Sequence, residues 1–82
     1  MNRDYVLYNL KEAAEELERT VAEMAQDPEF DEGELRVAVE HAYHHINTAW
    51  NARNVSESRA KACSEKDFAE WRRFPEDIDL EP

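Results

Sequence analysis

Apolar residues recur at alternating spacings of three and four along the first third of the chain, and this pattern constrains the fold strongly. This stripe consists of Leu7, Leu10, Ala14, Leu17, Val21 and Met24. The pattern fits the a and d positions of nearly three heptads and predicts a helix over residues 4–26, which Asp27-Pro28 ends. A second amphipathic segment follows closely. We therefore expect the stripe to form the core of an antiparallel helical hairpin.

The start of the second helix carries the strongest local signal in the chain. Asp31 can act as its N-cap, and Glu34, three residues later, completes a capping-box pattern with Asp in place of Ser or Thr. Phe30 and Leu35 occupy the two positions of a hydrophobic staple. These features predict a second helix over residues 32–54.

A short third helix is expected near the end of the chain. Ser64 can cap it, Asp67 lies three residues further on, and Pro75 stops it, which predicts a helix over residues 65–74. Its aromatic side chains should fold back onto the hairpin. Residues 55–64 fit a helix or a loop, and we expect a break early in this stretch.

Composition supports a single all-α domain. The 82 residues include one glycine and three prolines, which are too few turn residues for an all-β protein. We expect one helical domain over residues 1–75 and an acidic tail over residues 76–82. Cys63 is the single cysteine, so no intrachain disulfide can form. The sequence shows neither an apolar run of membrane-spanning length nor a signal-peptide core, so the expected location is cytoplasmic, away from the membrane.

The charge balance bears on possible partners. Twenty acidic and ten basic side chains give a net charge of −10. An acidic surface repels phosphate backbones, so direct binding to nucleic acid is disfavoured. The same charge leaves open an alternative function, in which the chain is an acidic inhibitor or nucleic-acid mimic that occupies a basic groove on a partner protein.

Three asparagines lie along one strip of the second helix, beside two aromatic residues. Asn47, Asn51 and Asn54 are spaced by four and three, and Tyr43 and Trp50 run along the neighbouring edge. Asparagine is a poor helix former because its amide competes for backbone groups, so a solvated face more readily uses Glu, Lys or Gln. We interpret these five residues as an interaction surface. The other interpretation is a polar seam that is partly buried inside the fold or inside a dimer.

The histidines raise a metal site as a weaker hypothesis. His41 and His45 lie four residues apart on the second helix, and Glu34 lies two turns earlier on the same flank, so the three could chelate one ion. The chain lacks the His-Glu-x-x-His signature and any cysteine pair. We expect no metal and no cofactor, with both histidines hydrogen-bonded across the hairpin instead.

No residue pattern points to catalysis. Cys63 has no histidine near it in sequence, and the single Gly33 cannot make a glycine-rich loop for a phosphate. The leading hypothesis is a non-enzymatic protein–protein interaction module. Two helices can bury only one apolar stripe each against the other, so we also expect a homodimer that forms a dimeric helical bundle.

Overall fold

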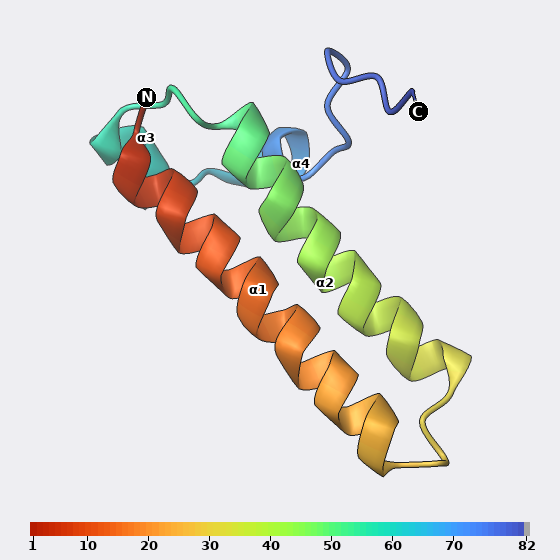
Figure 1. Cartoon of the computed structure of the whole chain (residues 1–82). Helices are drawn as coiled ribbons and strands as arrows, with labels where there is room; N and C mark the ends of the chain where they lie inside the picture. Colours follow the sequence, from red (N-terminus) through yellow and green to blue (C-terminus); the bar gives the residue numbers. More distant parts are fainter. Residues whose placement is uncertain (82) are drawn as a thin grey trace.

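Two long helices run antiparallel and side by side along the molecule (Figure 1). In the computed structural model, which describes residues 1–81, α1 spans Arg3–Gln26 and α2 spans Glu32–Asn51. The residues between them turn the chain back on itself. The described residues form helices and no strand, so the all-α hairpin expected from the sequence is confirmed.

Side-chain caps begin both long helices. Asn2 Oδ1 accepts a hydrogen bond from the Tyr5 N–H at 3.1 Å, and Asp31 Oδ1 accepts one from the Glu34 N–H at 2.9 Å. The N-cap expected at Asp31 is therefore confirmed. The backbone N–H of Asn2 also donates to the Arg53 carbonyl at 2.6 Å, which ties the start of α1 to the end of α2.

The chain after α2 forms two short helices where one was expected. α2 ends at Asn51, three residues earlier than expected, and α3 (Glu57–Ala62) and α4 (Glu65–Trp71) follow. The expectation of three helices is therefore wrong. The physical reason is Ser56, whose side chain accepts a hydrogen bond from the Arg59 N–H at 3.2 Å and so caps an additional helix.

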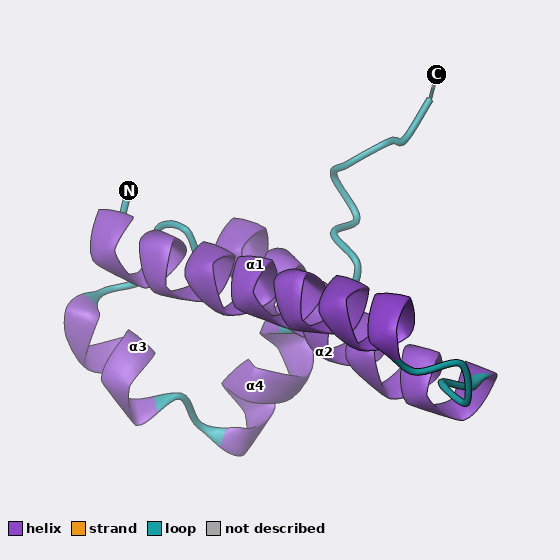
Figure 2. Cartoon of the chain, turned by 60° about the horizontal axis from the view of Figure 1, so that its bottom comes forward, coloured by secondary structure: helices purple, strands orange, loops and turns teal. Residues whose placement is uncertain are grey.

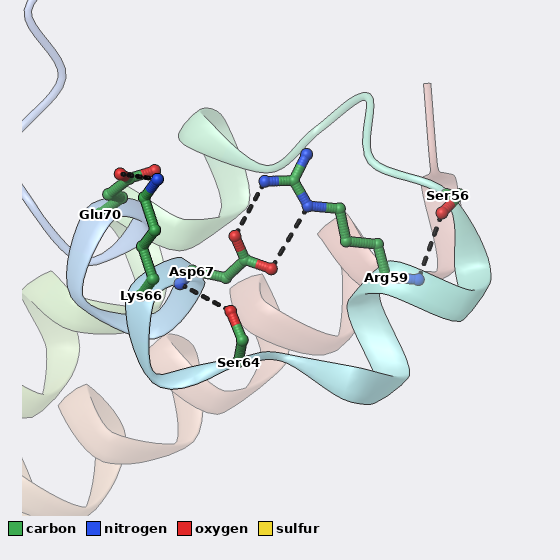
Figure 3. A network of polar contacts seen from close by, with 6 residues as sticks. All are labelled: Ser56, Arg59, Ser64, Lys66, Asp67 and Glu70. Carbon is green, nitrogen blue, oxygen red and sulfur yellow. Dashed lines mark hydrogen bonds and ion pairs between the residues drawn. The ribbon is translucent and has the colours of Figure 1, made fainter.

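α3 and α4 lie on the same side of the hairpin (Figure 2). Figure 3 shows the ion pair that joins them, in which Arg59 Nη2 donates to Asp67 Oδ1 at 2.8 Å and Nε donates to Oδ2 at 3.3 Å. The hydrogen bonds from Arg59 hold the pKa of the buried Asp67 carboxyl below its usual value. Ser64 accepts from the Asp67 N–H at 3.1 Å, so the expected cap of α4 is confirmed.

The interior of the hairpin is made of small and polar side chains. Its buried apolar residues are Ala13, Ala38, Ala42, Ala49 and Ala52. Asn9 is the largest fully buried side chain, and its Oδ1 lies 2.9 Å from Nδ1 of the buried His45. Asn9 Nδ2 donates to the Tyr5 carbonyl at 3.0 Å, so Oδ1 is the acceptor and His45 Nδ1 carries the proton.

The apolar stripe of α1 faces solvent, so the expectation that it forms the hairpin core is wrong. Leu7 is 53% exposed and Val21 is 68% exposed. Apart from Val6, the less exposed residues of α1 are instead Tyr5, Asn9, Glu12, Ala13, Glu16 and Thr20. At about 100° per residue, these residues lie roughly a third of the way round the helix from the stripe. A hairpin that buried the leucines would withdraw the Asn9 amide from His45.

The start of the acidic tail is anchored near the end of α2. The indole N–H of Trp50 donates to Asp77 Oδ1 at 3.0 Å, and the Arg53 guanidinium lies 3.8 Å from the centroid of the Trp50 ring. Arg53 Nη2 also lies 4.0 Å from Asp77 Oδ2. The chain then leads away from the hairpin (Figure 2), and Pro82, the last residue of the expected tail, lies outside the described residues.

Removing the Asp31 side chain tests whether its cap stabilises α2. The Asp31→Ala variant should lower the free energy of unfolding by about 1 kcal/mol, because the Glu34 N–H loses its hydrogen-bond acceptor. Urea denaturation followed by circular dichroism measures the change. Glu29→Ala, at an exposed position in the same turn, is the matched control and should change the value by less than about 0.5 kcal/mol. Equal effects of the two variants would show that α2 does not depend on this cap.

Candidate interaction surface

Large apolar side chains of both long helices gather on one side of the hairpin. We refer to this set as the apolar face, and every member is at least 38% exposed. It consists of Leu7, Leu10, Leu17, Val21 and Met24 of α1 and Leu35, Val39, Tyr43, Ile46 and Trp50 of α2. An apolar groove runs between the helices in this face, lined by Leu17, Val39, Ala42, Tyr43 and Ile46. The two helices therefore present one continuous apolar surface.

Helix geometry explains why both stripes reach the same side. On each helix, at about 100° per residue, the exposed apolar residues lie roughly 110–120° round from the buried ones. α2 runs antiparallel to α1, which reverses the sense of rotation, so equal offsets fall on the same side of the hairpin. A groove that takes lining residues from both helices agrees with this geometry.

The apolar face is large for a chain of this size. Ten half-exposed side chains leave on the order of 800 Å² of apolar surface uncovered, about the share that one partner contributes to a standard interface. The largest apolar patch on a typical monomer covers about 300–600 Å². A surface of this size favours an interaction site over an ordinary solvated face.

Trp50 lies at one end of the apolar face and has its polar atom satisfied within the chain. Its indole N–H donates to Asp77, and Arg53 covers one face of the ring. The ring is still 38% exposed. A partner can cover the remaining surface without leaving the N–H unpaired. Tyr43, which is 52% exposed, lies two turns earlier on the same helix.

Two of the three asparagines hold the end of α4 against α2. Asn47 is buried, and its Nδ2 donates to the Arg72 carbonyl at 2.9 Å. Asn51 Nδ2 donates to the Trp71 carbonyl at 2.9 Å and to the Arg73 carbonyl at 2.7 Å. Their amides therefore donate to carbonyls at the end of α4, so these two side chains stabilise the fold.

The residues expected to form one interaction surface thus fall into two groups. Tyr43 and Trp50 belong to the apolar face, whereas Asn47 and Asn51 face the segment that follows α4. Asn54 is exposed in the turn after α2. The apolar face is the better candidate for binding a partner, and it includes the α1 leucines that the sequence analysis placed in the core. Asn9, Glu16 and Thr20 lie on one side of α1, and this polar side was the sequence signal that could have predicted exposed leucines.

The three histidines form a cluster against α1. The ring centroids of His41 and His45 are 5.0 Å apart, and those of His44 and His45 are 4.5 Å apart. His41 Nδ1 lies 3.2 Å from a carboxylate oxygen of Glu16, and His45 Nδ1 donates to Asn9. His41 and His45 therefore both contact α1 across the hairpin.

The metal hypothesis finds no ligand set among residues 1–81. No group of three or more His, Cys, Asp or Glu side chains is arranged there to hold a metal ion. His41 and His45 do lie together, but His45 Nδ1 is engaged with Asn9. Glu34 lies at the start of α2, beside the Asp31 cap, and does not complete the site.

Burial lowers the pKa of His44 and of His45 below the ordinary value of 6.5. For His44, the neighbouring His45 and the Arg72 guanidinium lower the pKa further. For His45, the neighbouring His41 lowers the pKa further, and the carboxylates of Glu12 and Glu16 partly oppose the two effects. Burial therefore favours the uncharged form of both rings.

Comparison with known proteins adds no relative. No family model, no curated protein and no solved structure matches the chain. No helix within the described residues is both long enough and apolar enough to cross a membrane. The side chains and their contacts are therefore the basis for inferring a function.

The lowered pKa values of His44 and His45 predict a loss of stability in mild acid. Because folding lowers the pKa of both rings below 6.5, the folded state binds fewer protons than the unfolded state once the pH falls below that value. The free energy of unfolding should therefore fall as the pH drops from about 7.5 to about 5.5. Urea denaturation at several pH values measures this slope.

A variant separates the histidines from other titrating groups in that measurement. His44→Gln should reduce the slope, because it removes one of the two groups whose pKa differs between the folded and unfolded states. An unfolding free energy that is constant or increases as the pH falls through 6.5 would contradict the lowered pKa of His44 and His45.

Proposed function

We propose that this protein is a non-enzymatic protein–protein interaction module and that the partner on its apolar face is a second copy of the same chain. The observation that carries the proposal is the exposure of ten large apolar side chains on one side of a hairpin with an alanine-rich, polar interior. Monomeric soluble proteins rarely leave a patch of this size uncovered. Burying it gives association a hydrophobic driving force.

A second copy fits the apolar face in shape and area. The face is formed by two antiparallel helices of 24 and 20 residues, and a two-fold axis through its groove would bring four helices into one bundle. Each copy would bury on the order of 800 Å², as one partner does in a standard interface. A chain of 82 residues forms only a thin core alone, and dimerisation enlarges that core.

The residues around the groove supply the expected contacts. Leu17, Tyr43 and Ile46 line the groove and would pack against their symmetry mates. Fully burying a side chain of this kind stabilises by roughly 1.5–3 kcal/mol, so a few central residues dominate the interface. Trp50 would pack at the edge, where its N–H already has a partner.

The salt dependence of association separates this proposal from recognition of a basic groove. Two chains of charge −10 repel each other outside the uncharged face, so added salt screens this repulsion and should strengthen the dimer. An acidic chain that binds a basic groove through its carboxylates would lose affinity as salt is added. The two functions therefore predict opposite trends.

A charge placed in the groove should break the dimer. Sedimentation equilibrium of the wild-type chain should show a monomer–dimer equilibrium, and Ile46→Glu should raise its dissociation constant at least about tenfold, because a carboxylate would be buried without a partner. Val37→Glu is the matched control. Val37 is 66% exposed on the same helix and lines a separate hollow with Gly33 and Thr20.

Two results would contradict the proposal that a second copy covers the apolar face. One is a single monomeric species from micromolar to near-millimolar concentration, which would require a different partner. The other is equal weakening by Ile46→Glu and Val37→Glu, which would place the dimer contact away from the groove.

A further inference from the structure

A cavity of about 260 Å³ lies between the hairpin and the two short helices, which pack on one side of it (Figure 2). A small set of side chains holds α4 in this position. The amides of Asn47 and Asn51 donate to carbonyls at the end of α4. The rings of Tyr5 and Trp71 meet edge to face with centroids 6.1 Å apart. The attachment of α4 therefore depends on few side chains, and His44 is one more of them.

The two short helices form one unit that depends on the hairpin for its structure. The ion pair of Arg59 and Asp67 joins α3 to α4. Hydrogen bonds from Arg59 lower the pKa of the Asp67 carboxyl, so the pair keeps its charges in mild acid. Helices of six and seven residues are too short to be stable alone in water. If α4 leaves the hairpin, both short helices should therefore unfold together.

His44 contacts α4 and has no acceptor for a second ring proton. Its ring meets the Phe68 ring with centroids 4.9 Å apart. His44 Nδ1 is buried and has no hydrogen-bond partner within residues 1–81. A neutral ring can carry its one proton on Nε2, whereas an imidazolium carries a proton on each nitrogen. Protonating His44 in place would therefore bury an N–H donor without an acceptor, which is costly.

The surroundings of His44 also disfavour a positive charge. After burial, the neighbouring His45, the Arg72 guanidinium at the end of α4 and His41 lower its pKa, in that order. Among the described residues, the lining of the cavity includes no Asp or Glu that could balance the charge. The other titratable side chains of the lining are tyrosine and cysteine, which carry no charge in mild acid.

The other two histidines of the cluster have partners on α1. His41 Nδ1 lies 3.2 Å from a carboxylate oxygen of Glu16, so His41 can take up a proton without leaving its place. His45 Nδ1 donates to Asn9, and the carboxylates of Glu12 and Glu16 favour its charged form. Among the three rings, His44 is therefore the one for which protonation and attachment of α4 conflict most directly.

We propose that α3 and α4 form an acid-sensitive latch, in which protonation of His44 releases residues 57–71 from a hairpin that stays folded. The released segment unfolds, and aromatic side chains that line the cavity become exposed to water. Because the attached state disfavours the charged ring, the released state binds more protons once the pH falls below about 6.5. The released population therefore rises as the pH falls, and a single titrating ring limits the rise to about tenfold per pH unit.

Native-state hydrogen exchange of the full chain, measured by NMR at pH 7.5 and pH 5.5, tests the latch. The Phe68 N–H donates to the Ser64 carbonyl at 2.8 Å, so its exchange reports the unfolding of α4. Its protection factor, taken relative to the unprotected amide at the same pH, should fall about three- to tenfold between the two pH values. It should also stay below the protection factors of the Ala42 and Ala49 amides in the buried part of α2.

Two matched variants assign the pH dependence to one ring. In His44→Gln the Phe68 protection factor should change by less than about twofold over this pH range, because the titrating group is gone. His41→Gln makes the same substitution in the same cluster, at the histidine that has a carboxylate partner, and should keep most of the fall. Circular dichroism checks that each variant retains its helices.

Three results would overturn the latch. The first is a Phe68 protection factor in the wild-type chain that does not fall with pH. The second is the same fall in His44→Gln as in the wild-type chain. The third is equal protection of Phe68 and Ala42 at pH 5.5, which would show that α4 and the hairpin open only together. The first and third results need no variant.

Discussion

The hydrogen bond between Asn9 and His45 joins the faces on which the two long helices meet. Asn9 is 2% exposed and His45 is 7% exposed, and leaving a buried polar group of this kind unpaired costs about 1–3 kcal/mol. The second half of the Asn9 amide is used by the Tyr5 carbonyl. Rotating α1 so that its leucines faced α2 would break this pairing, whereas a partner that covers the leucines leaves it intact.

Two surfaces with different chemistry follow from this arrangement. The apolar face lies on one side of the hairpin and has few polar atoms at its centre, which suits association with a second chain. The cavity lies under α3 and α4, where Asn47 and Asn51 hold the end of α4 in place. The apolar groove and the cavity share no lining residue.

Sequence reasoning succeeded where the determining interactions are local. The caps at Asp31 and Ser64 bond to N–H groups three residues away, so the starts of α2 and α4 could be read from short patterns. The same argument applied to Ser56 would have found α3. Periodicity shows that α1 has an apolar side but not what covers that side. The hydrogen bond between Asn9 and His45 joins residues 36 positions apart, so a short sequence pattern cannot reveal it. The cavity also depends on contacts between distant elements, which no local pattern indicates.

If a second copy of the chain covers the apolar face, folding and association are linked. The most direct measurement is urea denaturation of the wild-type chain at about 2 μM and about 200 μM protein. Linked dimerisation predicts a midpoint that rises clearly with protein concentration, because mass action favours the associated folded state. A midpoint that is the same at both concentrations would contradict the claim and would describe a hairpin that folds alone with its apolar face in water.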